Sequence, residues 1–192
     1  MNPFLIIQKH YDPASELYRL LVTHSILVTK KAIEIAVDFQ ARHPEATVDL
    51  DFVAEAAMLH DIGIYRCDSP KIFCTGRESY IRHGILGREI LEAEGLPRHA
   101  LVCERHTGAG ISKEEVVRQA LPLPVRDYLP LSIEEKIICL ADKFYSKTPQ
   151  KLFREKQLGK IHEKMSKWGP KATARLEELC DLLLPNWQRE CD

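Results

Sequence analysis

The chain has 192 residues, long enough to bury a substantial core, and we expect one domain over residues 1–192. Its 27 basic and 28 acidic residues give a formal net charge of -1, so no nucleic-acid polymer or membrane partner attracted by overall charge is expected. The start "MNPFLIIQKH" has neither a basic leader nor a long apolar run, which favours a cytoplasmic protein. Six cysteines without a C-x-x-C pair indicate reduced thiols.

Apolar residues at helical spacing recur along most of the chain and predict an all-α fold. Pro122, Pro124 and Pro130 instead predict an extended connector, and no segment alternates as a strand would. The first predicted helix begins at Ser15 and ends within "RHPEA". Four more cover 51–61, 79–94, 97–106 and 132–147. Another begins at Thr148-Pro149, and the last covers 169–185.

Ionisable residues interrupt the apolar faces of several predicted helices. His24 has leucine and valine neighbours at i±3 and i±4, and His60 completes an apolar stripe just before Asp61. Asp142 follows an apolar run in "KIICLADKF", with no basic residue at helical spacing on its apolar face. Burying an unpaired carboxylate costs several kcal/mol, so we expect a cation beside it.

Two further histidines extend this set. His83 shares a helix face with Gly87, and Gly84 and Gly87 would allow close approach of another backbone. His106 ends the predicted helix 97–106. Nitrogen and oxygen donors suit divalent metals, and the lack of sulfur argues against a purely structural zinc site. The candidate metal ligands are His24, His60, Asp61, His83, His106 and Asp142.

Charge arithmetic favours two metal ions over one. Two carboxylates contribute a charge of about -2 and two divalent ions about +4, so the centre has a net charge of about +2 and attracts phosphate. Asp61 is the natural bridging ligand because it directly follows a ligand histidine. A single ion would leave His83 and His106 without a role.

These motifs resemble the HD-domain metal-dependent phosphohydrolases. The signature reads His24, then His60-Asp61 in "LHDIG", then Asp142 in "LADKF", and the extra His83 and His106 match the subset that binds two metals. The resemblance implies a helical bundle with the metal centre between its helices. "RHTGAG" followed by "LSIEEKIICLADKF" is most similar to the small bacterial HD proteins that hydrolyse dinucleoside tetraphosphates. We expect a signature region over 15–148 and a helical extension over 149–192 that adds core packing or a homodimer face.

Basic residues near the centre are candidates for substrate contact. Many relatives carry a lysine directly after HDIG, where this chain has Ile64. Arg66, Lys71 and Arg77 lie in the segment between the His-Asp pair and His83, either as a lid that binds substrate phosphates or as ordinary surface charges. Lys143, next to Asp142, is our candidate catalytic residue alongside Asp61. The Gly-Tyr-Pro motif of the cyclic-di-GMP phosphodiesterase branch is absent.

The sequence therefore predicts a metal-dependent phosphohydrolase that cleaves a phosphoester or phosphoanhydride bond through a metal-bridging hydroxide. The resemblance implies a small phosphorylated substrate, a nucleotide or dinucleoside polyphosphate. We expect two divalent ions, iron first, with manganese, zinc, nickel, cobalt or magnesium as alternatives. Three other hypotheses stay open: a single-metal nucleotidase, a non-catalytic nucleotide sensor, and a helical scaffold with incidental buried histidines.

Overall fold

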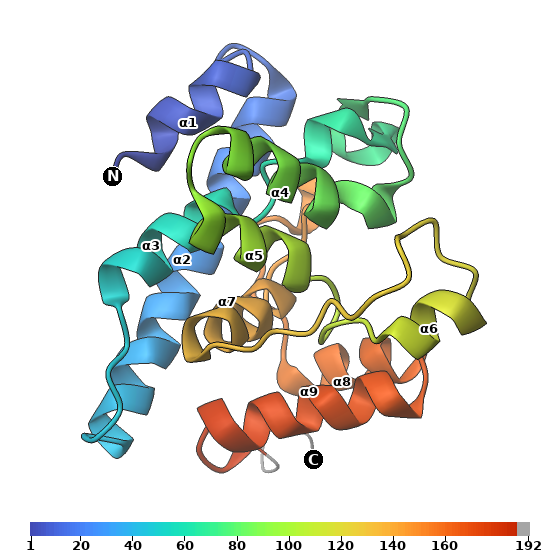
Figure 1. Cartoon of the computed structure of the whole chain (residues 1–192). Helices are drawn as coiled ribbons and strands as arrows, with labels where there is room; N and C mark the ends of the chain where they lie inside the picture. The colour runs from blue at the N-terminus through green and yellow to red at the C-terminus, as the bar shows by residue number, and fades with distance from the viewer. Residues whose placement is uncertain (188–192) are drawn as a thin grey trace.

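A computed structural model describes residues 1–187 and shows nine α-helices in that range (Figure 1), confirming the all-α class. Residues 188–192, the end of the predicted extension, lie outside the described part. The helices are α1 (Pro3–His10), α2 (Glu16–Arg42), α3 (Leu50–Leu59), α4 (His83–Ala93), α5 (Pro97–Arg105), α6 (Lys113–Arg118), α7 (Ile133–Lys143), α8 (Leu158–Ser166) and α9 (Pro170–Leu183).

The long helix α2 is the central support of the fold. It begins where predicted, because the Ser15 hydroxyl accepts a hydrogen bond from the Tyr18 amide at 3.1 Å, and it ends two residues before Pro44. Its apolar face packs against α3 and α7. The main core lies between these helices, and buried His24 belongs to the same face of α2.

Glycines let α4 and α5 pack closely, as the sequence predicted. A Cβ on Gly84 would stand 2.6 Å from the carbonyl oxygen of Cys103 in α5. A Cβ on Gly63 of the HDIG stretch would overlap the backbone of α4. Because these side chains are absent, three backbone segments meet at short range and carry their neighbouring histidines with them.

The segment between α3 and α4 contains short elements that the sequence did not predict. Two 3₁₀ helices flank a small antiparallel hairpin and a third joins its strands, which have two residues each and are too short to show alternation. The prediction of no strand was therefore wrong here. The elements are η1 (Ile64–Arg66), β1 (Asp68–Ser69), η2 (Pro70–Ile72), β2 (Cys74–Thr75) and η3 (Tyr80–Arg82).

Several predicted helix limits also differ. The predicted helix 132–147 ends at Lys143, and Thr148-Pro149 opens only the 3₁₀ helix η4 (Pro149–Lys151). Helices α1, α6 and α8 were not predicted. Helix α6 did carry a signal, because Ser112 and Glu115 form a reciprocal capping box at its start.

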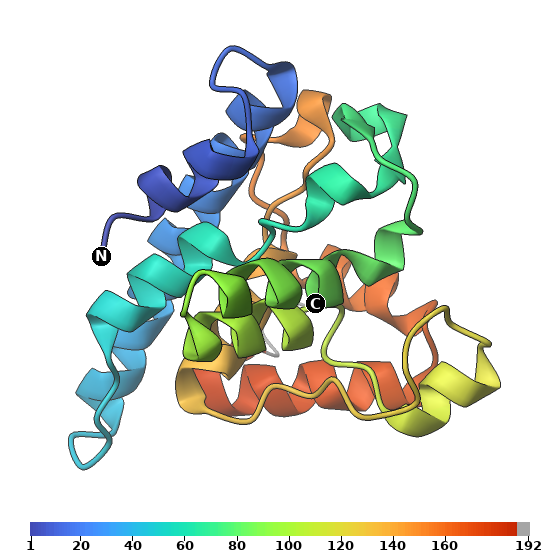
Figure 2. The same ribbon diagram turned by 45° about the horizontal axis from the view of Figure 1, so that its top comes forward.

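The C-terminal helices share the core of the signature region. Leu158, Ile161 and Leu176 belong to the same buried cluster as the apolar residues of α7. Arg175 in α9 donates to the Gly110 carbonyl at 2.9 Å, which ties α9 to the loop after His106. The connector from α7 to α8, orange in Figure 2, rises from α7 beside the N-terminal helices before it returns to α8.

Candidate metal centre

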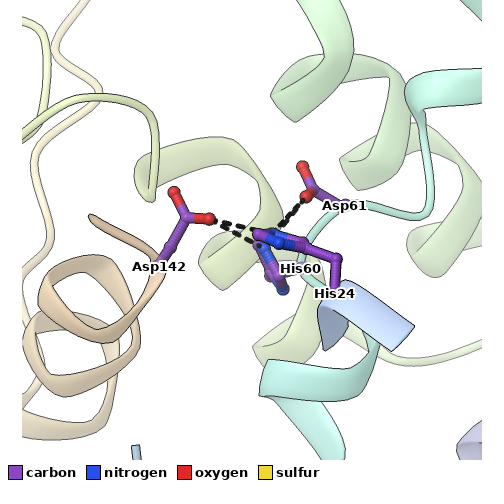
Figure 3. A group of neighbouring side chains, drawn as sticks. All are labelled: His24, His60, Asp61 and Asp142. Atoms are coloured by element: carbon purple, nitrogen blue, oxygen red, sulfur yellow. Dashed lines mark hydrogen bonds and ion pairs between the residues drawn. The ribbon is translucent and has the colours of Figure 1, made fainter. Parts of the chain in front are cut away.

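Four of the predicted ligands converge where α2, the end of α3 and α7 meet (Figure 3). His24 Nε2 lies 3.1 Å from Asp142 Oδ1 and 3.3 Å from Asp61 Oδ2. His60 Nε2 lies 3.0 Å from Asp61 Oδ2 and 3.5 Å from Asp142 Oδ1. Donors that share one divalent ion at bond lengths of about 2.1 Å stand roughly 3.0–3.5 Å apart. The four side chains are therefore spaced as ligands of one ion.

The remaining two histidines form a second group with Asp61. His83 Nε2 and His106 Nε2 lie 3.5 and 3.4 Å from Asp61 Oδ1, and 3.0 Å from each other. Asp61 thus presents Oδ2 to the first group and Oδ1 to the second. All six predicted ligands come together, and one carboxylate joins their two groups.

Three of the histidines sit at helix boundaries that fix their orientation. His60 and His106 cap the C-terminal ends of α3 and α5, and His83 begins α4. Each Nδ1 lies 2.6 to 2.8 Å from the carbonyl oxygen of the residue three positions earlier. A carbonyl can only accept, so each Nδ1 carries the hydrogen, and Nε2 of a neutral ring presents a lone pair. Such second bonds are typical of metal-ligating histidines.

The second group is electrostatically incomplete without a cation. Burial and the neighbouring His106 lower the pKa of His83 to about 3, and burial also lowers the pKa of His106, so both rings stay neutral. Their Nε2 lone pairs then face each other at 3.0 Å with no hydrogen between them. Asp61 Oδ1, the oxygen that faces this group, is buried and accepts no hydrogen bond. A metal ion at this position would satisfy all of these atoms.

Charges in the first group also favour a cation. Burial alone would lower the pKa of His60, but Asp61 and Asp142 raise it to about 9. Burial opposes ionisation of Asp61, yet the charges of Lys147 and His60 hold its pKa well below the usual range. The cluster therefore keeps its carboxylates ionised, and its imidazole and carboxylate donors can hold divalent ions such as iron, manganese or zinc.

Lys147 is a site residue that the sequence did not reveal. Its ammonium lies 2.6 Å from Asp61 Oδ2 and 3.6 Å from Asp142 Oδ1, the same oxygens that face His24 and His60. A helix continued to residue 147 would have directed this lysine elsewhere. Because α7 ends at Lys143, the chain instead turns back toward Asp61.

Lys143 corrects the expectation that Asp142 has no basic partner. Its ammonium lies 2.8 Å from Asp142 Oδ2 and donates to the His106 carbonyl at 3.1 Å. The two Cα–Cβ bonds diverge along the helix, but a lysine side chain is long enough to reach back to its neighbour. Asp142 is therefore both a candidate ligand and an ion-pair partner.

The three residues predicted to bind substrate differ in their position relative to the cavity beside the centre. Lys71 lines a cavity of about 370 Å³ that Asp142, Lys143 and Lys147 also line, and this volume falls in the roughly 300–1,000 Å³ range of small-molecule pockets. Arg66 pairs with Glu89 at 2.7 Å and does not line the cavity. Arg77 does not line it either. Of the three, Lys71 alone lines the cavity beside the centre.

Comparison with known proteins agrees with this geometry. A family model described as the HD domain matches residues 21–146, a range that includes all six candidate ligands. The chain belongs to the HD-domain family. None of the helices in residues 1–187 combines the length and apolar character that a membrane crossing requires.

Relatives of this HD protein carry two kinds of name. An uncharacterized protein of Methanocaldococcus jannaschii is 39% identical over 150 residues, which cover 74% of this chain and 79% of that protein. Two proteins named tRNA (cytidine(56)-2'-O)-methyltransferase, from Picrophilus torridus and Thermoplasma volcanium, are 43% and 33% identical. Those two matches cover 51% and 66% of this chain but 25% and 32% of the relatives. No solved structure matches at a significant level.

Proposed function

We propose that this HD protein is a two-metal phosphohydrolase that hydrolyses a phosphoester or phosphoanhydride bond of a nucleotide. One ion would be held by His24, His60, Asp61 and Asp142, and the other by Asp61, His83 and His106. The observation that carries the proposal is the division of Asp61 between two ligand groups, with Oδ2 facing one and Oδ1 facing the other.

The positive charge of two bound ions would explain how such a centre promotes hydrolysis. Bound divalent ions would lower the pKa of an attacking water and offset charge on the phosphoryl oxygens. The protein's own part is orientation: carbonyls fix the rings of His60, His83 and His106, so that the donor atoms are set before substrate arrives.

Lys143 and Lys147 would act on the substrate side of the centre. Both line the cavity, and both pair with carboxylates that are candidate metal ligands. A phosphate that enters this cavity meets their ammonium groups, which would stabilise the negative charge that develops on its oxygens. Lys147 is also our candidate for the role of the lysine that many relatives carry after HDIG.

The test is a phosphate-release screen on protein reconstituted with iron(II) or manganese. The panel contains nucleoside monophosphates, nucleoside diphosphates and dinucleoside polyphosphates, with Asp61→Ala as the blank and exposed Asp51→Asn as the matched control. We expect release by wild type and Asp51→Asn only. Equal release by Asp61→Ala would overturn the assignment of the centre.

The alternatives give different results in the same experiment. A single-metal nucleotidase would release phosphate while holding one ion per chain in elemental analysis. A non-catalytic sensor would release none, yet a nucleotide would raise its melting temperature.

We infer a second candidate substrate, a phosphoester at an RNA end, from the tRNA methyltransferase names of two relatives. The matched segment makes up 25% and 32% of those proteins, so there it is one part of a longer chain. Short RNAs with terminal or cyclic phosphates therefore belong in the panel. Release from RNA alone would favour this candidate over free nucleotides.

A further inference from the structure

The cavity beside the metal centre extends well beyond it, to residues of the C-terminal helix α8. Its wall includes Lys71 from η2, and Ile161, Lys164 and Trp168 from α8 or the residues just after it. These α8 residues lie outside the part of the chain that the HD family model matches. The extension therefore forms one side of the space that a substrate would enter.

Five lysines line this cavity, and three of them have partners in the protein. Lys143 and Lys147 pair with Asp142 and Asp61. Lys156 donates to the carbonyl oxygens of Lys143 and Tyr145 at 2.6 and 2.7 Å, at the end of α7. The Lys156 ammonium thus stabilises the backbone at the end of α7 and is less available to a ligand in the cavity.

The other two lysines, Lys71 and Lys164, have no ion-pair partner within residues 1–187. They come from different elements, η2 and α8, and both are exposed. Asp142 is the one carboxylate among the described residues that line the cavity. Partial burial and repulsion from Lys143 and Lys147 lower the pKa of Lys164, which shows that these positive charges lie close together. An anion bound beside Lys164 in this cavity would relieve this repulsion.

A single phosphate at the metals would be served by Lys143 and Lys147, which are the lysines in contact with the candidate ligands. Lys71 and Lys164 would then remain for a second anionic group. At the α8 side the wall also presents the partly exposed indole of Trp168. A flat aromatic surface of this kind stacks on nucleobases.

We propose, on the basis of the phosphohydrolase function above, that α8 completes an outer subsite for a nucleoside diphosphate or longer polyphosphate. Lys164 and Lys71 bind the phosphate next to the one held at the metals, and Trp168 packs against the base. The extension thus selects substrates with linked phosphates and does not take part in bond cleavage.

Binding of non-hydrolysable probes tests the phosphate part. Methylphosphonate carries one anionic group and methylenediphosphonate carries two, and calorimetry on manganese-loaded protein gives their Kd values. We expect Lys164→Gln to weaken methylenediphosphonate about tenfold and methylphosphonate less than twofold. Lys164→Arg should stay within threefold of wild type for both probes. Lys167→Gln, at the end of the same helix but outside this cavity, is the matched control.

Two results would overturn the outer subsite: equal weakening of both probes by Lys164→Gln, or equal effects of Lys164→Gln and Lys167→Gln. Failure of the phosphohydrolase proposal looks different. In that case no phosphate is released from any substrate, while the preference for methylenediphosphonate still depends on Lys164.

The base contact has its own test. Trp168→Leu should weaken binding of α,β-methylene adenosine diphosphate about tenfold, because the base loses the aromatic surface on which it stacks. It should leave methylenediphosphonate within twofold, since that probe has no base. Equal loss of both probes would show that Trp168 only supports the wall and would overturn the base contact.

Discussion

The ligand cluster and the lysine-lined cavity are neighbours, but they are built in different ways. His24 on α2 and the His60-Asp61 pair at the end of α3 are fully buried, and apolar neighbours fix their positions. The cavity lysines come mostly from connectors and from the C-terminal extension, and Lys71 and Lys164 are exposed. Core packing thus fixes the positions of the candidate metal ligands, whereas the paths of irregular segments determine which ligands the cavity can bind. Substitutions should accordingly affect the two parts differently.

The largest expected effect is at the shared carboxylate. Asp61→Asn removes the charge that would hold both ions, so we expect kcat for phosphate release to fall about 10³-fold or more. Exposed Asp51→Asn, which makes the same chemical change in the first turn of α3, should stay within twofold. Retention of a tenth of wild-type kcat by Asp61→Asn would mean that the chemistry lies elsewhere.

Lys147→Met tests whether the cavity contributes to the reaction itself. We expect kcat to fall about 10²-fold while metal content is unchanged, because the lysine stabilises charge on the substrate and is not a ligand. Exposed Lys151→Met is the control. Loss of metal together with activity would instead place Lys147 in the support of the ligand cluster.

Lys156→Met should affect the free energy of unfolding more than it affects kcat. The substitution leaves two carbonyl oxygens at the end of α7 without their charged donor, and we expect a loss of about 1–2 kcal/mol in the free energy of unfolding. Denaturant titration measures this loss, with Lys160→Met as the control because the partner of Lys160 is the exposed Glu163. An equal loss of unfolding free energy in both variants would contradict a structural role for Lys156.

The smallest effects are expected at the arginines that sequence reasoning had proposed for substrate binding. Arg66→Gln and Arg77→Gln should change KM less than twofold, because neither residue lines the cavity. Lys71→Gln, in the same segment, should raise KM severalfold. A larger change at either arginine would show that this segment moves to cover the substrate.

The sequence was informative where a polar residue interrupts an apolar helix face. His24 and Asp142 were predicted as ligands because helical periodicity alone forces their burial, and burial demands a partner. Gly84 likewise predicted a close helix contact, since a missing side chain matters only where another backbone approaches.

The cavity was much harder to predict. Lys147 reaches Asp61 because α7 stops at Lys143, and the carbonyl at that end accepts a hydrogen bond from Lys156, thirteen residues farther along the chain. Lys164 lies on a helix whose start was not predicted, so no local signal placed it at the cavity that Lys71 also lines. Long-range packing, which periodicity does not encode, decides both positions.

The central claim is that Asp61 joins two metal ions. It is tested most directly by elemental analysis of protein purified without oxygen and saturated with iron(II) or manganese, in wild type and in His83→Gln. The account predicts two ions per chain in wild type and one in His83→Gln, whose first ligand group is intact. One ion per chain in both proteins would contradict it.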